Sequence, residues 1–331
     1  MKIGTLELGE KPLFLAPMES VTDPSFRFIC KEYGADVLCT EFVSSDGLIR
    51  GAKSTKEKLL IEPYEYPIAI QIYGHIKEAM VEAAQIAAHS SPSYLDINFG
   101  CPVRKIAGRG AGSGMMRNPD KLIEITEAVV KAVSLPVTVK TRLGWDMESK
   151  IIVDLALRLQ DVGVAALTIH GRTGTQLYRG EADWTLIGEI KESSKITIPI
   201  VGNGDIKDAA GAKEAFDRYG VDGVMIGRAT YGRPWLFKQI KRLIETGEEL
   251  PDPTTLERVE LAKKHLLKSV EVKGERVGVL EMRRHLSAYF KGYPNFKELR
   301  FKLVTESDYR VILDLLDMVV ELYPQQVELL V

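Results

Sequence analysis

The sequence predicts an α/β fold: a (β/α)8 TIM barrel followed by a small C-terminal helical bundle. Eight short apolar segments alternate with helix-like segments over about 240 residues, the usual size of such a barrel, and no strand-like segment follows them. The chain has 331 residues, of which 45% are hydrophobic and 27% charged. It is therefore long enough for this barrel and a second, smaller domain.

The eight strand segments are short, rich in Val and Ile, and bounded by Gly or Pro, as expected of buried parallel strands. In chain order they are LFLAPME from Leu13, DVLCTEFV from Asp36, PIAIQIYG from Pro67, YLDINFG from Tyr94, PVTVKTRLG from Pro136, AALTIHGR from Ala165, IPIVGNGDI from Ile198 and GVMIGRA from Gly223. The residues before the first strand predict a short hairpin. An open doubly wound sheet is the alternative, but no GxGxxG follows the first strand and eight regular units favour closure.

The acidic, Pro-containing segment ETGEELPDPTT at 245–255 ends the predicted barrel. We therefore divide the chain into a barrel domain at 1–245 and a helical domain at 254–331. Thr254 and Glu257 have the spacing of a capping box at a helix start. Helical periodicity then predicts four helices, at 255–272, 276–291, 295–304 and 306–322.

Charge is unevenly distributed in this second domain. The net charge is −2, but the segment from Arg258 to Lys302 holds twelve Lys and Arg against five Asp and Glu, whereas the segment from Leu303 to the end holds one against six. The predicted helical domain is therefore basic on one part and acidic on another, which matters more for partners than the total. Ordinary solvated helix faces are the plain alternative.

Cysteine usage and hydropathy indicate a cytoplasmic protein. Cys30, Cys39 and Cys101 are far apart and lack CxxC spacing, so we expect neither a disulfide framework nor a metal site. No apolar run reaches the eighteen or so residues of a membrane span, and the first residues lack the pattern of a signal peptide. We expect no membrane association.

The strand ends carry the chemistry. In such barrels the active site is built at the C-terminal ends of the strands and in the loops after them. All eight predicted strands end in polar or sulfur-bearing residues: Met18 and Glu19, Glu41, Gln71, Asn98 and Cys101, Lys140 and Arg142, His170 and Arg172, Asn203 and Asp205, and Arg228. The pattern predicts a catalytic or ligand-binding mouth.

Two features suggest the ligand. Glycines in GNGDI and IGRA, the second containing Arg228, follow the last two strands, where such barrels bind phosphate. Lys140 could form a Schiff base, bind phosphate or neutralise an anionic ring. Gln71 and Met18 favour the third role, because an amide can bond to a flavin edge and a nearby cation stabilises the reduced ring. Alternatively, Lys140 forms an ion pair with Glu41 or Asp96.

Cys101 lies in a Gly-rich loop after the fourth strand. A thiol can act as nucleophile, metal ligand or proton donor. A general acid needs only reach and a suitable pKa, and a flexible loop suits a residue that closes over a substrate. Cys30 and Cys39 are expected to be small core residues.

These motifs resemble those of one family. DINFGCPVRKIAGRGAGSGMM closely resembles the signature of tRNA-dihydrouridine synthases, and APMESVTDPSFR, TEFVS, QIYG, VKTRLGW, IHGRT, VGNGDI and MIGRAT occur in that family's order and spacing. The resemblance is strong from about residue 12 to 245 and looser in the helical tail. Within this family the sequence most resembles the bacterial branch, which has no added zinc-finger or double-stranded-RNA module.

The resemblance implies an enzyme that holds FMN in the barrel mouth, takes hydride from NADPH and reduces the C5–C6 double bond of uridine in tRNA. It implies that Cys101 gives a proton to C5 while hydride passes from flavin N5 to C6. The implied cofactor contacts are Pro17, Met18, Glu19, Gln71, Lys140, His170, Asn203, Gly204, Asp205, Gly227 and Arg228.

The tRNA contacts follow partly from the resemblance and partly from charge. The resemblance implies that Asn98 and Arg142 contact the uracil or its ribose phosphate. The loop cations and the basic side of the helical domain are candidates for the RNA backbone. They are Arg104, Lys105 and Arg109 in the loop, and Lys263, Lys264, Lys268, Arg283, Arg284, Lys291, Lys297, Arg300 and Lys302 in the helical domain. We expect a monomer without an obligate protein partner.

Three alternatives remain open at this stage. A dihydroorotate-dehydrogenase-like flavin enzyme would act on a free pyrimidine and would not need a basic helical tail. A sugar-phosphate isomerase or lyase would use Lys140 as a Schiff base. A tRNA-binding chaperone would need no catalytic Cys101.

Overall fold

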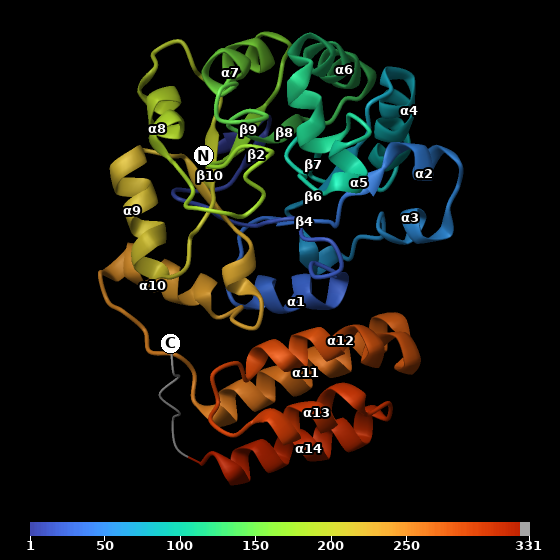
Figure 1. The fold of residues 1–331 in the computed structure, drawn as a ribbon, viewed down its shortest axis with the longest axis vertical. Helices are drawn as coiled ribbons and strands as arrows, with labels where there is room; N and C mark the ends of the chain where they lie inside the picture. Colours follow the sequence, from blue (N-terminus) through green and yellow to red (C-terminus); the bar gives the residue numbers. More distant parts are fainter. Residues whose placement is uncertain (325–331) are drawn as a thin grey trace.

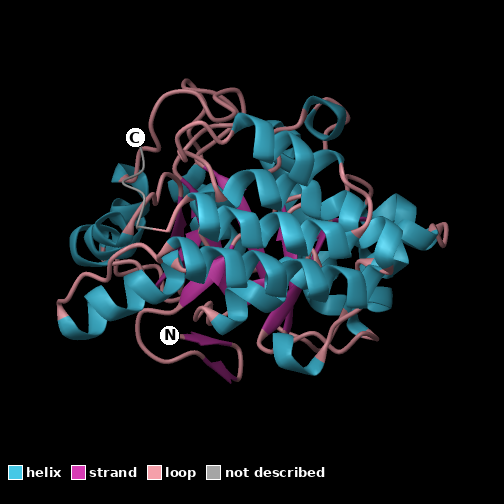
Figure 2. Ribbon diagram, turned by 90° about the horizontal axis from the view of Figure 1, so that it is seen from below, coloured by secondary structure: helices cyan, strands magenta, loops and turns pink. Residues whose placement is uncertain are grey.

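Eight parallel strands form a barrel in the computed structural model, which describes residues 1–324. They are β3 (Leu13–Leu15), β4 (Leu38–Cys39), β6 (Ile68–Tyr73), β7 (Tyr94–Asn98), β8 (Val137–Arg142), β9 (Ala166–His170), β10 (Ile200–Asn203) and β11 (Gly223–Ile226). A bridge between Phe14 and Val37 joins the two ends of the sheet, where Leu15 N–H donates to the Val37 carbonyl at 2.9 Å. The predicted barrel is confirmed, and Figure 2 shows its strands enclosed by helices.

The outer layer of the barrel consists of helices that follow the strands (Figure 1). They are α1 (Pro24–Glu32), α2 (Ser45–Ile49), α3 (Lys53–Glu57), α4 (Lys77–Ala88), α5 (Arg104–Ala107), α6 (Pro119–Ala132), α7 (Ile152–Asp161), α8 (Thr185–Glu192), α9 (Ala209–Tyr219) and α10 (Leu236–Thr246), with 3-10 turns at Pro63–Glu65, Gly112–Arg117 and Arg228–Thr230. Their apolar faces and the outer faces of the strands form the main core. The expected N-terminal hairpin is present as β1 (Lys2–Ile3) and β2 (Leu6–Glu7).

The second predicted strand is interrupted. It separates into β4 and β5 (Val43–Ser44), which pair with successive parts of β6. Between them the Thr40 hydroxyl accepts a hydrogen bond from Gln71 N–H at 3.3 Å, and the Glu41 side chain accepts one from Ser20 N–H. At Thr40 a side-chain oxygen thus accepts the Gln71 N–H of the neighbouring strand, and periodicity alone does not predict this interruption.

The barrel interior changes from apolar to polar along its axis. Ile3 of the hairpin, Phe14, Tyr94 and other apolar side chains fill the end where the strands begin. Further along, the strand register aligns Asp96 with Thr138 and Asn98 with Lys140. Because paired residues on parallel strands point to the same side, polar side chains gather at the end where the strands finish.

The C-terminal helices pack against one another and against one side of the barrel (Figure 1). They are α11 (Thr255–Lys273), α12 (Glu275–Tyr289), α13 (Lys297–Thr305) and α14 (Tyr309–Leu322), close to the predicted ranges. The Thr254–Glu257 capping box is formed in both directions. Asp308 caps α14 and delays its start relative to the prediction. Residues 325–331 of the predicted helical domain lie outside the described residues.

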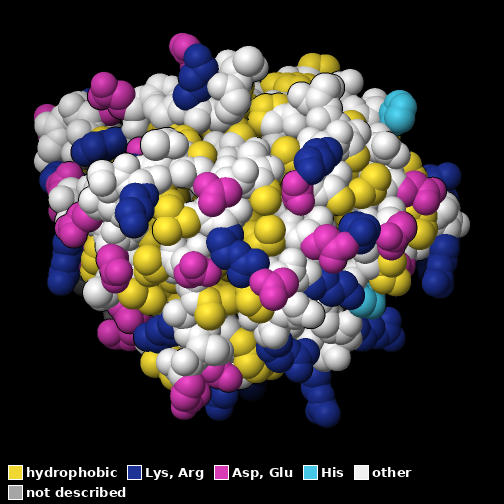
Figure 3. Space-filling model, turned by 90° about the horizontal axis from the view of Figure 1, so that it is seen from above, with side chains coloured by type: hydrophobic (Ala, Val, Ile, Leu, Met, Phe, Trp, Pro, Cys, Tyr) yellow, Lys and Arg dark blue, Asp and Glu magenta, His cyan; other side chains and the backbone are white. Residues whose placement is uncertain are grey.

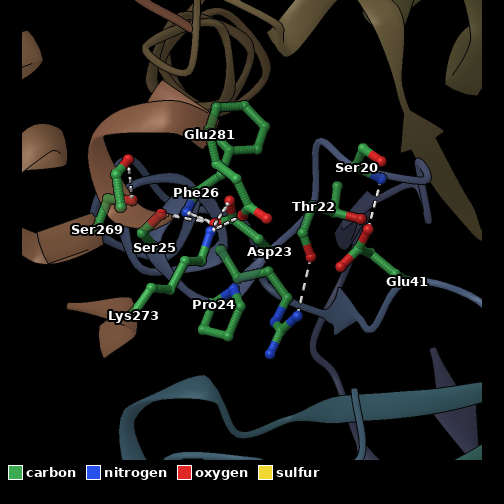
Figure 4. Close-up of polar contacts among 12 residues, drawn as sticks. Ser20, Thr22, Asp23, Pro24, Ser25, Phe26, Glu41, Ser269, Lys273 and Glu281 are labelled. Atoms are coloured by element: carbon green, nitrogen blue, oxygen red, sulfur yellow. Dashed lines mark hydrogen bonds and ion pairs between the residues drawn. The ribbon is translucent and has the colours of Figure 1, made fainter. Parts of the chain in front are cut away.

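The helical bundle shares its core with the barrel. Ile29 of α1 and Trp235, which precedes α10, belong to the same buried cluster as α11–α14. Lys273 of α11 bonds to Asp23 and Glu281 at 2.5 Å each, as Figure 4 shows. Burial raises the pKa of the Asp23 carboxyl, but the charge and hydrogen bond of Lys273, together with His285 and His265, outweigh burial and lower this pKa overall. An ionic contact therefore supports the apolar one.

Among residues 1–324, no helix combines the length and the apolar character needed to cross a membrane.

Removing the buried cation should destabilise this interface. Lys273→Met leaves the nearly buried Asp23 carboxylate, 7% exposed, without its cation. We expect the free energy of unfolding to fall by about 3 kcal/mol. Lys264→Met is the matched control, because Lys264 also joins α11 to α1 but its pair with Glu32 is 52% and 36% exposed. That variant should lose less than about 1 kcal/mol. Urea unfolding of both measures the difference, and equal losses would contradict it.

Candidate active site

One large cavity opens where the barrel strands end. Its volume is about 1500 Å³, and its wall continues from the barrel mouth to residues of α11, α12 and the turn after α12. Pockets for single small molecules are typically about 300–1,000 Å³. The cavity therefore has room for a bound ligand and a second group inserted beside it.

Cys101 lies on the wall of this cavity, just after β7. The Asn98 side chain holds the turn before it, since Asn98 Oδ1 accepts from the N–H groups of Gly100 at 3.0 Å and Cys101 at 2.8 Å. The thiol is 9% exposed. Burial raises its pKa, and the Val103 N–H and Arg142 offset this only in part. Cys101 is therefore a protonated thiol at neutral pH, as a proton donor must be. Cys30 and Cys39 are core residues, as predicted.

Lys140 lies at the end of β8 and reaches across the mouth. Its ammonium donates to Asn203 Oδ1 at 3.0 Å, and Asn203 is fixed in turn by donating to the Met225 carbonyl at 2.8 Å. Burial, together with the positive charge of Arg142, lowers the pKa of Lys140 to about 8, against the opposing charge of Asp96. Within residues 1–324, neither Glu41 nor Asp96 forms an ion pair with Lys140, so that alternative is not observed.

His170, at the end of β9, is a neutral imidazole. Burial, reinforced by the charges of Lys140 and Arg142, lowers its pKa well below the usual value. Its Nδ1 is buried and has no hydrogen-bond partner among residues 1–324. Buried polar atoms in folded proteins are normally paired, so this nitrogen is a candidate contact for a bound ligand.

An Asp205-centred cluster forms the far rim. Asp205 binds Arg172 through both oxygens, at 2.9 and 2.6 Å, and Arg228 at 3.0 Å. Gly204 precedes it with φ +125, and a Cβ there would lie 2.7 Å from the side chain of Ala182. Gly227 precedes Arg228 on the adjacent strand end. Bare main chain thus lies beside the half-exposed Arg228 guanidinium, an arrangement suited to an anion.

Asn203 and Asp205 are among the cofactor contacts that the resemblance implies. In the structure their side-chain oxygens accept hydrogen bonds from Lys140, Arg172 and Arg228. These side-chain oxygens hold the three cations in place. Gly204, Gly227 and Arg228 lie beside them and present main chain and a guanidinium, which suit an anion.

The remaining predicted cofactor contacts divide into two groups. Pro17, Met18 and Glu19 line the cavity. Gln71 is 0% exposed and does not line it, because its amide bonds to Asp96 and Asn98 inside the barrel. A strand-end position predicted that Gln71 would face the barrel interior, but not how deep it would lie.

The predicted tRNA contacts also divide. Asn98 and Arg142 line the cavity, and Arg142 is anchored by donating to the carbonyls of Gly100, Thr173 and Leu177 at 2.8 Å each. Three loop cations are exposed outside the lining: Arg104, Lys105 and Arg109. In α12, Arg283 donates to carbonyl groups at the end of α13, and Arg284 donates to the Ser20 carbonyl beside the mouth. The structure uses these two arginines to join elements.

Several cavity residues escaped the sequence prediction. Tyr178 lies in the loop after β9, with the guanidinium of Arg228 4.4 Å and that of Arg142 5.6 Å from its ring centre. Loop residues carry no periodic signal, so nothing in the sequence marked it. From the other domain, Arg258 joins the wall, and the excess of basic residues was the one available signal for it. Lys291, which was among the predicted basic candidates, also lines the cavity and is exposed.

Comparisons with known proteins agree with one another. A family model described as dihydrouridine synthase matches residues 14–320. The probable tRNA-dihydrouridine synthase of Rickettsia conorii is 40% identical over 301 residues, which cover 91% of this chain and 90% of that protein. The tRNA-dihydrouridine synthase B of Pseudomonas aeruginosa is 37% identical, covering 91% and 90%.

Solved structures with similar folds are more distant in sequence. A morphinone reductase mutant in complex with tetrahydroNAD has a TM-score of 0.54 at 15% identity, covering 76% of this chain and 92% of that one. A 2-naphthoyl-CoA reductase complex has a TM-score of 0.57 at 13% identity, covering 73% and 51%. At these identities the likeness concerns the barrel fold alone.

The depressed pKa of Lys140 gives a testable pH dependence. The folded pKa, about 8, lies below the ordinary value of 10.5, so the unfolded chain binds more protons between these values. The free energy of unfolding of the wild type therefore rises as Lys140 loses its proton between about pH 8 and 10.5. Lys140→Met has no such increase. We expect the free energy of unfolding of ligand-free Lys140→Met to exceed that of the wild type by the largest amount at neutral pH, and this excess to shrink as pH rises to 10.5. Urea unfolding over pH measures it, and a pH-independent difference would contradict it.

Proposed function

The chain belongs to the dihydrouridine synthase family, and we propose that it reduces the C5–C6 double bond of uridine in tRNA with FMN as bound cofactor and NADPH as reductant. One observation carries this proposal: the protonated Cys101 thiol shares a cavity with Lys140, His170 and an anion-binding rim at Gly204, Gly227 and Arg228. This is the donor set that a flavin phosphate and a flat base to be protonated would require.

The chain's own side chains fit FMN. The phosphate would be held by main chain at Gly204 and Gly227 and by the guanidinium of Arg228. His170 Nδ1, buried and without a partner in residues 1–324, and the Lys140 ammonium would serve the polar edge of the ring. Asp205 and Asn203 would orient these cations, and Pro17, Met18 and Glu19 would line the cofactor's surroundings.

The reaction needs a hydride at one ring carbon and a proton at its neighbour. FMN, reduced by NADPH, supplies the hydride to C6 when bound. Cys101 supplies the proton to C5 from its thiol, which burial keeps protonated at neutral pH. Lys140 holds a positive charge in the mouth, and Asn98 and Arg142 contact the uracil or its ribose phosphate. Cys101 is then reprotonated from solvent.

A uridine in tRNA must leave its stack to reach Cys101, which costs a few kcal/mol. Contacts to the RNA backbone must offset this cost. Candidates are the exposed cations Arg104, Lys105 and Arg109 beside the mouth and Lys291 on the bundle side. On the side of the barrel turned away from the helical bundle, basic and acidic side chains are interspersed, and this view shows no continuous basic patch (Figure 3). A cavity that continues onto the bundle also favours a macromolecular substrate over a free pyrimidine.

The proposal extends to the roles of the two parts of the chain, to the cellular location and to the oligomeric state. Helices α11–α14 act as the tRNA-binding part and residues 1–245 as the catalytic barrel. We propose a cytoplasmic monomer without an obligate protein partner, because tRNA would span both parts of one chain.

Removing the proposed proton donor is the direct test. Cys101→Ala should retain FMN and accept hydride from NADPH, but dihydrouridine formation should fall by about 10²–10⁴. Cys30→Ala is the matched control, since Cys30 is fully buried in the core and should leave turnover intact. Flavin absorbance, anaerobic flavin reduction and dihydrouridine content of tRNA are the readouts. Full turnover by Cys101→Ala would remove the thiol from the mechanism.

Charge reversal tests the RNA surface. Lys291→Glu should weaken tRNA binding and reduce the slope of log K against log salt by about one. Lys2→Glu is the control, because Lys2 belongs to the hairpin that closes the opposite end of the barrel and should change neither quantity. Titrations of tRNA binding at several salt concentrations measure both the affinity and the slope. An unchanged slope for Lys291→Glu would exclude this residue from the interface.

A further inference from the structure

Beneath Cys101, three buried side chains form one chain of hydrogen bonds. Gln71 Nε2 donates to Asp96 Oδ2 at 2.6 Å, and Asn98 Nδ2 donates to Gln71 Oε1 at 2.7 Å. Asn98 Oδ1 then accepts from the N–H groups of Cys101 and Gly100. Asp96, Gln71 and Asn98 are 5%, 0% and 5% exposed. The main chain at Cys101 is thus connected to a carboxyl group inside the barrel.

The two ends of this chain determine its direction. A main-chain N–H can only donate, and the Asp96 oxygen facing Gln71 accepts. Gln71 must therefore turn its NH2 group toward Asp96 and its oxygen toward Asn98. Asn98 must then turn its NH2 group toward Gln71 and its oxygen toward the N–H of Cys101. Rotating either amide would bring two donors or two acceptors face to face in a buried site, which is costly.

The direction of this chain is the same for both charge states of Asp96, because the Cys101 N–H at the other end can only donate. The Thr138 hydroxyl donates to Asp96 Oδ1 at 2.5 Å. Burial raises the pKa of the Asp96 carboxyl, while the bonds from Gln71 and Thr138 and the charge of Lys140 act in the opposite sense. If Oδ1 takes a proton, the Thr138 hydroxyl can accept instead of donate. Oδ2 remains an acceptor for Gln71 in both charge states.

We propose that Asp96 is a positioning residue for Cys101 that acts through Gln71 and Asn98. The inference rests on the proposed function, in which Cys101 gives the proton. The loop after Cys101 contains Gly110 and Gly112 at positive φ. The Cys101 carbonyl accepts a hydrogen bond from the Ser113 N–H at 2.9 Å, but the N–H side of Cys101 is held by Asn98. The Asn98 oxygen supplies a fixed point, and the orientation of that oxygen originates at Asp96.

The test removes the acceptor at the buried end and measures the position of the thiol. In purified Asp96→Leu, we expect iodoacetamide to alkylate Cys101 about tenfold faster than in the wild type, since a buried hydrogen-bond acceptor is lost and the loop opens more often. Peptide mass mapping separates Cys101 from Cys30 and Cys39. Dihydrouridine formation in a single turnover should fall about tenfold to a hundredfold, while flavin reduction by NADPH stays near the wild-type rate.

Two further variants separate positioning from general destabilisation. Asp96→Asn should restore most of the wild-type alkylation rate, because its amide oxygen can face Gln71 and its NH2 group can face the Thr138 hydroxyl. Thr138→Val removes a buried bond to Asp96 but leaves the Gln71–Asn98 chain intact. It should alkylate and turn over as the wild type does, whatever its thermal midpoint. Thermal midpoints of all variants are measured alongside.

The inference is overturned if Asp96→Leu and Thr138→Val alkylate Cys101 at the same rate. Should Asp96→Leu fail to fold, Gln71→Met decides, because it interrupts the chain at its middle. Faster alkylation of Gln71→Met supports the inference, and a rate equal to that of Thr138→Val overturns it. Alkylation reports where the thiol is and requires no turnover. An active Cys101→Ala would therefore remove the proposed reaction without affecting this measurement.

Discussion

The site depends on burying several cations in the mouth of an otherwise apolar barrel. Lys140, Arg142 and Arg172 repel one another, and burial opposes their charge; it lowers the pKa of Arg142 to about 10. Each is held by oxygens: Asn203 for Lys140, three carbonyls for Arg142, and Asp205 with main-chain carbonyls for Arg172. Because most of these acceptors are neutral, positive charge remains in excess. The mouth is thereby prepared for anionic ligands, at a cost in stability of the empty protein.

The helical bundle forms part of the cavity wall, through Arg258 and the residues around the end of α12. Ile29 and Trp235 lie in the bundle core, and Arg258 stacks on Trp235 with its guanidinium 4.8 Å from the ring centre. The loop after α12 therefore keeps a fixed position beside the barrel mouth. Removing the bundle would expose the apolar face of α1, so truncation is a poor test of RNA binding, and single exposed cations are better ones.

The sequence predicted the features that follow from local patterns, such as where each strand ends. Parallel strands end at one edge of a barrel, so Cys101, Lys140, His170 and Arg228 could be assigned to one mouth from strand ends alone. It was less informative where partners come from distant segments. Three features depend on which groups meet across strands or domains: the depth of Gln71 in the barrel, the bond from Lys140 to Asn203, and the bond from Arg284 to a main-chain carbonyl. Tyr178 reaches the cavity through a loop whose path is set by such contacts.

The buried chain from Asp96 to Cys101 addresses a conflict in this design. In the proposed reaction, Cys101 must lie on a cavity wide enough to admit a base, where few side chains can pack against the thiol. Tight packing would fix the thiol but fill the space that the substrate needs. A hydrogen-bond chain meets both needs. Asn98 fixes the main chain of Cys101 on the side facing the barrel interior, and the thiol of Cys101 stays on the cavity wall. The polar interior of the barrel is then part of the positioning of the thiol, even though Asp96 and Gln71 never line the cavity.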